Sequence, residues 1–261
     1  MNCWICGSPN VSGEHIPKAS TLKTLFGSVS TSAPLFLSGE KRRNRPLQSI
    51  NSVFLKYKQI CANCNNSLTQ KHDQAWDQFF AYLQVNADLL SIGSKISRAK
   101  LFGHNAKKME VFLQLYLLKI FGTLCANHNV AIDFIGIGNS IKNSVAYPNF
   151  YFGISKRLWL NHLKAVLGSP IHIERSSITG KVEIAIQMMI IDKWQFEFIY
   201  VDPSYQIRKF PKCWNPLISS GFTVKNFEKR WCRFNRQRKL SVAFRDANGH
   251  PASVIPTRNV Q

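Results

Sequence analysis

The chain has 261 residues, of which 45% are hydrophobic, so it can bury a substantial core as one large domain or two smaller ones. Lysine and arginine number 34 against 14 acidic residues, a formal net charge of +20. Such an excess attracts polyanions, and solubility alone is the weaker explanation for a charge of this size. Nucleic acid is therefore the first expected partner and an anionic membrane surface the second.

The seven cysteines argue against a disulfide framework, because their number is odd and four of them form Cys-x-x-Cys pairs. This usage indicates a reducing, cytoplasmic compartment. The N-terminus lacks a basic-then-apolar leader, so no secretory signal is expected. The most apolar stretch, 111–125, is interrupted by Gln114, Lys119 and Gly122 and is too short to span a bilayer. We therefore predict a buried helix there and no membrane insertion.

The first 84 residues are predicted to contain a short helix over 21–26 and a strand over 52–60, where apolar residues alternate with lysines. Between them, the basic run 39–46 is expected to form an exposed loop. Its cations could contact phosphates or simply face water, and they are Lys41, Arg42, Arg43 and Arg45.

A helix beginning at Asn65 or Asn66 is predicted to follow, because four large apolar residues recur at three- and four-residue spacing. These residues are Trp76, Phe79, Phe80 and Leu83. His72 is expected on the solvated face of this helix, although it could contact a phosphate or metal. A helical connector over 85–128 should contain a second long helix over 106–124.

Beyond residue 128, short β-type runs predict a basic α+β domain over 129–261 with a mostly antiparallel sheet. Strands are expected within 130–137, 146–154, 171–178, 182–191 and 194–201, with a hairpin turn at Thr179-Gly180 and a helix over 156–167. The complete fold class is α+β: an N-terminal zinc module, then helices, then the sheet unit.

The segment 208–239 interleaves basic and aromatic residues and contains a single acid, Glu228. Base stacking and phosphate neutralisation would explain this mixture. The aromatic residues could equally complete the core while the basic side chains face water. The cations chosen as nucleic-acid contacts are Arg230, Arg233 and Arg236.

Two Cys-x-x-Cys pairs, Cys3/Cys6 and Cys61/Cys64, supply the ligand set of one structural zinc ion with four thiolates. An ordinary zinc ribbon without catalysis would use the same set. A Glu14-His15 dipeptide follows the first pair, and Asn65 follows the second. The zinc would therefore bring a carboxylate, an imidazole and an amide close together, as a metal-dependent hydrolytic site requires.

Over residues 1–80, the motifs GEHIPK and CANCNN resemble those of the HNH endonucleases, which are zinc-stapled ββα-metal nucleases. The resemblance implies that His15 is the general base and that Glu14 and Asn65 hold a catalytic divalent ion. Oxygen ligands favour Mg²⁺ or Mn²⁺ at that centre, whereas thiolates favour Zn²⁺. His15 could instead be a surface or zinc-supporting histidine, Glu14 could merely cap or pair with a lysine, and Asn65 could cap the helix.

The chain departs from the family pattern at two points. The middle asparagine that orients the loop bearing the base is missing, since Leu55 and Lys56 occupy that neighbourhood and Asn51 lies farther upstream. The last motif residue is Asn65, where many members have histidine. Both departures leave room for weaker metal binding or for a module that only binds nucleic acid.

The leading functional hypothesis is a metal-dependent HNH endonuclease that hydrolyses DNA, with DNA preferred to RNA as substrate. A second is a zinc protein that binds DNA or RNA without catalysis. A third is the nuclease subunit of a larger anti-phage or mobile-element complex, in which a protein partner gates activity.

Overall fold

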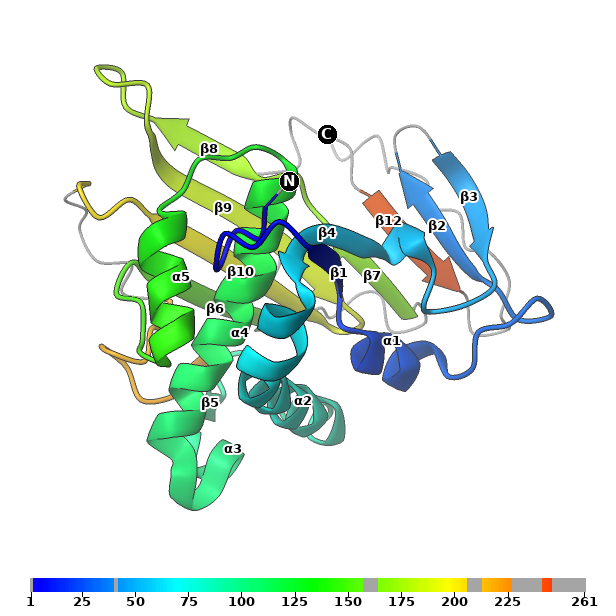
Figure 1. Ribbon diagram of the computed structural model, residues 1–261. Helices are drawn as coiled ribbons and strands as arrows, with labels where there is room; N and C mark the ends of the chain where they lie inside the picture. The colour runs from blue at the N-terminus through cyan, green and yellow to red at the C-terminus, as the bar shows by residue number, and fades with distance from the viewer. Residues whose placement is uncertain (1, 40–41, 157–163, 206–212, 227–240, 246–261) are drawn as a thin grey trace, which may run out of the picture.

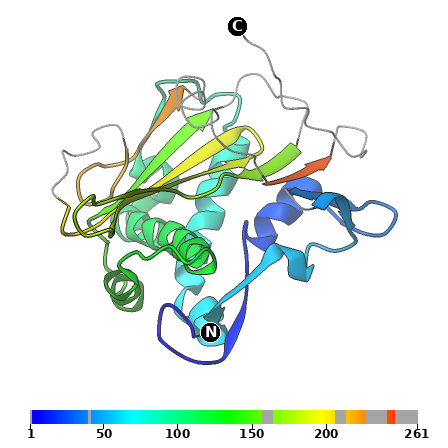
Figure 2. The same cartoon turned by 90° about the horizontal axis from the view of Figure 1, so that it is seen from above.

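The computed structural model describes residues 2–39, 42–156, 164–205, 213–226 and 241–245. It has the mixed α+β architecture expected from the sequence (Figure 1). Within these residues there are two sheets, one of two strands and one of ten. Viewed from above, the helices gather on one face of the large sheet (Figure 2).

The ten-stranded sheet is antiparallel throughout, except that β11 runs parallel to β6. Its strand order is β3-β2-β12-β7-β9-β10-β6-β11-β5, and β8 pairs with β9 off this path. The strands are β2 (Leu35–Gly39), β3 (Arg42–Leu47), β5 (Lys95–Ile96), β6 (Phe150–Lys156), β7 (Lys164–Gly168), β8 (His172–Arg175), β9 (Val182–Ile191), β10 (Trp194–Val201), β11 (Phe222–Asn226) and β12 (Ser241–Arg245).

The smaller sheet is an antiparallel pair of β1 (Val11–His15) and β4 (Lys56–Cys61). In this pair Glu14 faces Tyr57 and His15 faces Lys56, after a register shift at Gly13. A π-helical turn, Asn63–Leu68, leads from β4 into α2 (Gln70–Val85). Two strands and a helix thus lie together, although residues 16–55 separate the two strands in the sequence.

The helices are α1 (Ala19–Phe26), α2, α3 (Arg98–Phe102), α4 (Ala106–Asn127) and α5 (Phe134–Asn143). Short 3₁₀ turns cover Val53–Leu55 and Gly103–Asn105. Helix α4 lies between α2, α5 and the sheet, and every residue from Phe112 to Cys125 is buried. By length and composition, Arg98–Asn127 could cross a membrane, but 83% of its most apolar window is buried inside the protein. The predicted buried helix over 111–125 is therefore confirmed.

Helix α2 contributes the aromatic centre of the core. Trp76 stacks on Tyr116 of α4 with ring centroids 4.9 Å apart and meets Phe196 of β10 edge-on at 5.5 Å. Its indole Nε1 donates a hydrogen bond of 2.9 Å to Thr21 Oγ1 in α1. One indole therefore joins α1, α2, α4 and the sheet, as the predicted apolar face of α2 requires.

Three expectations of secondary structure are wrong. The run 39–46 was expected to be a loop, but Gly39 ends β2 and Arg42–Leu47 form β3, with residues 40–41 outside the described part. Strand β3 lies at the edge of the sheet, where charged residues and a proline such as Pro46 are tolerated. A basic run without hydrophobic residues can therefore still be a strand.

The other two errors lie in the C-terminal half. Residues 130–137 do not form a strand, because α5 begins at Phe134. Asp133 caps this helix by accepting a hydrogen bond from Gly136 N, and the glycines of the helix made this N-cap hard to recognise in the sequence. The helix expected over 156–167 is wrong at both of its ends, since Lys156 ends β6 and β7 begins at Lys164; residues 157–163 lie outside the described part. Pairing of β7 with β9 outweighs the local helical pattern there.

The remaining elements agree more closely with the sequence. Helices at 21–26, after Asn65, and at 106–124 are present, as are strands β6, β8, β9 and β10 and the turn at Gly180, where φ is +68°. The strand expected over 52–60 begins only at Lys56. The boundaries at residues 84 and 128 stay predictions, but β2, β5, β6 and β12 share one sheet although they come from all three predicted units.

Replacing Trp76 with alanine should destabilise the protein by about 3–5 kcal/mol, because the change leaves a large cavity and an unpaired Thr21 hydroxyl. Urea unfolding monitored by circular dichroism measures this. Val85→Ala on the same helix is the control, since Val85 is 83% exposed and its truncation should change stability by less than about 0.5 kcal/mol. Equal effects of the two changes would contradict this assignment of the core.

Candidate metal centre and the residues beside it

The first pair of cysteines lies in the loop before β1. Cys3 N donates to Ser8 O at 2.7 Å, and Gly7 N donates to Cys3 O at 2.7 Å, so the backbone folds back around the two thiols. Gly7 has φ +79°, a conformation that favours glycine. The second pair lies where β4 ends and the π-helical turn begins, and there Cys64 N donates to Cys61 Sγ at 3.4 Å.

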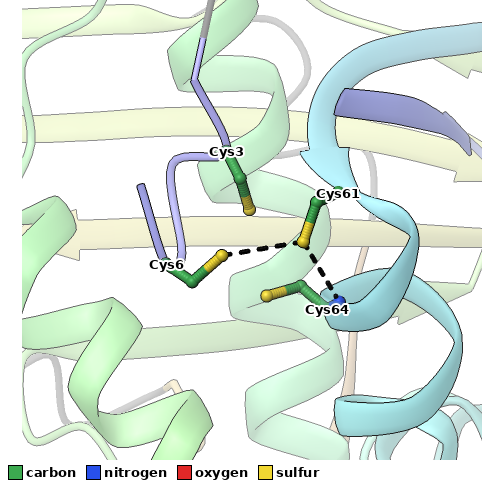
Figure 3. A group of neighbouring side chains, drawn as sticks. All are labelled: Cys3, Cys6, Cys61 and Cys64. Carbon is green, nitrogen blue, oxygen red and sulfur yellow. Dashed lines mark hydrogen bonds between the residues drawn. The ribbon is translucent and has the colours of Figure 1, made fainter. Parts of the chain in front are cut away.

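The four sulfur atoms point toward one another from these two turns (Figure 3). All of them lie within 4.8 Å of one another, and Cys6 Sγ is 3.6 Å from Cys61 Sγ. Four sulfurs around one zinc ion, with Zn–S bonds of about 2.3 Å, would lie about 3.8 Å apart. The predicted ligand set therefore converges with a geometry that can hold a metal such as zinc.

The surroundings of the thiols fit the same conclusion. Burial raises the pKa of Cys3 and of Cys64, whereas a backbone hydrogen bond with Ser8 lowers the pKa of Cys6. A buried group of thiols resists deprotonation until a cation stabilises the thiolates, so binding of zinc would release protons and strengthen as pH rises.

The loop that carries Cys3 and Cys6 is packed against the rest of the protein. Trp4 Nε1 donates to Thr123 Oγ1 of α4 at 3.2 Å. A Cβ at Gly122 would lie 2.7 Å from the Trp4 ring, and one at Gly138 of α5 would lie 3.0 Å from Ile5 O. The loop approaches α4 and α5 so closely that a side chain at either glycine would collide with it. These contacts fix the position of the thiol cluster relative to the two helices.

His15 lies at the end of β1, half-buried, opposite Lys56. Burial lowers the pKa of the imidazole, the charge of Lys56 lowers it further, and a hydrogen bond with the backbone of Ile50 opposes both. Its Nε2 is buried and has no hydrogen-bond partner among the described residues. The imidazole is therefore neutral near pH 7 and retains a nitrogen without a partner.

The zinc-site fold brings Asn65 against β1: its amide Nδ2 lies 3.4 Å from the carbonyl oxygen of Gly13, the residue before Glu14. Glu14 itself is buried, and its Oε1 lies 3.3 Å from Nζ of Lys119 in α4. The structure thus joins Glu14 and Asn65 through Gly13, but it directs the Glu14 carboxylate toward a lysine.

Lys119 is fully buried and faces three oxygen-bearing side chains. Its Nζ lies 2.6 Å from Asp73 Oδ1, 3.3 Å from Glu14 Oε1 and 3.3 Å from Thr69 Oγ1. Burial raises the pKa of Glu14 and of Asp73, and the Lys119 ammonium opposes this rise. We refer to Glu14, Asp73 and Lys119 as the buried charge triad.

The oxygen atoms beside β1 therefore fit a cation, and they already face a protein ammonium. Carboxylate and amide oxygens are also the donors that Mg²⁺ and Mn²⁺ accept. Within the described residues, the thiol cluster is the one grouping of three or more His, Cys, Asp or Glu ligands with this closeness. A divalent ion at Glu14 and Asn65 would have to share Glu14 with Lys119.

His72 does not lie on a solvated helix face, as the sequence had suggested. It is fully buried beside Phe112, with ring centroids 5.4 Å apart, and both of its ring nitrogens lack a hydrogen-bond partner among the described residues. Burial lowers its pKa to about 3, and the charges of Lys71 and Lys119 add to the effect. It is an uncharged core residue, and a contact with phosphate is excluded by its burial.

Few of the cations chosen as nucleic-acid contacts can be placed. Arg45 lies on β3 with its guanidinium 3.6 Å from the centre of the Phe54 ring. Arg42 and Arg43 lie in β3, but their side chains are outside the described part of the structure. Lys41, Arg230, Arg233 and Arg236 lie outside the described residues.

Sequence reasoning missed the role of Lys119. A single lysine inside the apolar run 111–125 looks only like an interruption of a hydrophobic helix, although a lysine buried there needs carboxylates. The scarcity of acids in the first 73 residues is a second signal, because only Glu14, Glu40 and Asp73 could serve as carboxylate partners from that part of the chain. Which of them a distant helix would meet depends on tertiary packing.

Comparison of the chain with protein-family models, with curated proteins and with solved structures found no match.

Cys61→Ser should reduce bound zinc from about one ion per chain to well below that level, because four thiolates are needed to close the site. Inductively coupled plasma mass spectrometry of protein purified without added metal measures the content. Cys213→Ser is the control, since Cys213 is buried but lies outside the cluster. Full zinc content in Cys61→Ser would refute the site.

Acidification should destabilise the protein through His72. Its folded pKa of about 3 lies below the ordinary value of 6.5, so the unfolded chain binds a proton that the folded chain refuses. The resulting stability is present above pH 6.5 and is lost as pH falls toward 3, by up to about 1.4 kcal/mol per pH unit. Urea unfolding between pH 6.5 and pH 5 should show a steeper loss for wild type than for His72→Leu. Parallel curves would show that His72 is not buried uncharged.

Proposed function

We propose that this protein is a metal-dependent HNH-type endonuclease that hydrolyses nucleic-acid phosphodiester bonds, with His15 as the general base. The observation that carries the proposal is the contact between Asn65 Nδ2 and Gly13 O, at 3.4 Å, beside the four-thiol cluster. It brings the residue after the last cysteine against the strand that ends in Glu14 and His15. The order of β1, β4 and α2 around the thiols supports the same assignment.

His15 would take the proton from the attacking water. A general base must be unprotonated at working pH, and the lowered pKa of His15 favours that state. The backbone of Ile50 would orient the ring, a task that the missing middle asparagine performs indirectly in the family. Lys56, opposite His15 in the strand pair, would attract the phosphate to this end of β1.

Glu14 and Asn65 would hold Mg²⁺ or Mn²⁺. Such an ion, when bound, neutralises charge on the scissile phosphate and on the departing oxygen. Glu14 offers a carboxylate from β1 and Asn65 an amide from the π-helical turn after β4, and Asn65 is kept against β1 by its bond to Gly13.

The positive charge of the whole chain supports a polyanionic substrate, with DNA preferred to RNA. A protein partner that gates activity, as in anti-phage or mobile-element complexes, belongs to the same proposal. A reducing, cytoplasmic location would keep the four thiols available for zinc.

One observation favours a second candidate, a zinc protein that binds nucleic acid without cutting it. Glu14 is buried and paired with Lys119, so its carboxylate has a partner in the protein itself. If that pair is permanent, no divalent ion binds and the module acts only through its charge. Binding would then fall steeply with salt.

Plasmid and single-stranded DNA incubated with Mg²⁺ or Mn²⁺ should be cleaved by wild type, and His15→Ala should lower the rate by at least ~100-fold, the usual contribution of a general base. His104→Ala is the control, because His104 is exposed and belongs to the 3₁₀ turn before α4. Its rate should equal that of wild type.

Equal cleavage by wild type and His15→Ala would refute the assigned base. Absence of cleavage with any metal, together with salt-dependent DNA binding in a fluorescence anisotropy titration, would establish the binding-only candidate instead.

A further inference from the structure

The buried charge triad contains an unequal pair of contacts. Lys119 Nζ approaches Asp73 Oδ1 at 2.6 Å but Glu14 Oε1 at 3.3 Å. Thr69 Oγ1 accepts a hydrogen bond from the same nitrogen at 3.3 Å and shares its own proton between the carbonyls of Cys64 and Asn65, each 2.9 Å away. Asp73 is thus the close partner of the ammonium. The Glu14 carboxylate, which makes the longer contact, can move away from Lys119 with the smaller loss of electrostatic stabilisation.

The charges of the triad do not cancel. Two carboxylates and one ammonium leave a formal charge of −1 in a largely buried place, since the side chains of Lys119, Glu14 and Asp73 are 0%, 6% and 18% exposed. A second ammonium, that of Lys18, is already engaged: it binds Asp77 Oδ2 at 2.6 Å and the Asp73 carbonyl at 3.2 Å. One negative charge beside Asn65 is therefore left for another cation to offset.

We propose that Lys119 is an internal competitor for the divalent ion: it holds Glu14 in the resting protein and releases it when the ion binds, while Asp73 and Thr69 retain the ammonium. This inference rests on the proposed function for the identity of the ion's ligands. Lys119 is a positioning residue, because its burial keeps it from any substrate. The divalent ion consequently binds weakly until Glu14 exchanges partners.

A partly buried ammonium elsewhere in this protein, that of Lys156, is held without carboxylates. Lys156 donates to the carbonyl oxygens of Ala87 and Leu90, the second at 2.8 Å, with no carboxylate among its described partners. Backbone carbonyls therefore suffice to satisfy a partly buried lysine. The two carboxylates around Lys119 exceed what one ammonium requires, which is the observation that points to a further cation.

The test is Mn²⁺ binding to the zinc-loaded, full-length protein, measured by electron paramagnetic resonance of free Mn²⁺. The double variant Asp73→Asn, Lys119→Met keeps the local formal charge at −1, since it removes one negative and one positive group from the triad. Because Glu14 is then released without a change of charge, Mn²⁺ should bind at least tenfold more tightly than to wild type. Adding Glu14→Gln to the double variant should abolish the gain.

A single variant keeps the proposal testable if the double variant does not fold. Asp73→Asn removes the close partner of Lys119, so the ammonium turns to Glu14 and Mn²⁺ affinity should fall at least tenfold. Asp77→Asn, which removes a carboxylate of the same helix that is paired with Lys18, is the matched charge control and should change affinity less than threefold.

Unchanged Mn²⁺ affinity in the double variant, or equal losses in Asp73→Asn and Asp77→Asn, would overturn the proposal. Because Mn²⁺ binding is measured without substrate, its outcome is separate from cleavage. Tighter binding by the double variant with no cleavage by wild type would support the competitor role and count against the nuclease.

Discussion

The meeting of four thiols is the constraint on which the other features depend. Cys3 and Cys6 come from a loop before β1, and Cys61 and Cys64 from the end of β4, so one metal ion would tie together segments 55 residues apart. The same loop packs through Trp4 against Gly122 of α4. The cluster therefore sets the position of the β1–β4 pair against both α2 and α4, and with it the position of His15, Glu14 and Asn65.

A second constraint is electrostatic and adjoins the first through Thr69, whose hydroxyl bonds the Cys64 carbonyl and accepts from Lys119 Nζ. Placing Lys119 in the centre of an apolar helix requires negative partners, because an unpaired buried ammonium is strongly unfavourable. Asp73 of α2 and Glu14 of β1 meet this need, so the same ion pairs that stabilise the packing of α4 also occupy a residue expected to bind metal. The Glu14 carboxylate is thus needed both to neutralise Lys119 and, in the proposed function, to bind the divalent ion. Whether Glu14 stays paired with Lys119 therefore separates the two candidate functions, cleavage of nucleic acid and binding without cleavage.

The sequence was informative where a local pattern determines the outcome. Cys-x-x-Cys spacing predicted the thiol cluster, and three- and four-residue spacing predicted the buried face of α2 around Trp76. Local patterns failed where pairing of distant strands decides: the basic residues of β3 form an edge strand, and residues 164–168 form β7 because β9 and β12 lie beside them. A lysine partner for Glu14 is among the expectations from the sequence, but its identity could not be predicted, because Lys119 is more than 100 residues away in the sequence. Local sequence patterns contain no information about a contact between residues so far apart.

The central claim is that the four cysteines, and no other side chains, bind one zinc ion. X-ray absorption at the zinc edge tests it most directly, since it reports the atoms bound to the metal in solution. The account predicts four sulfur neighbours at about 2.3 Å. A shell that contains nitrogen or oxygen atoms, or a purified protein without zinc, would contradict it.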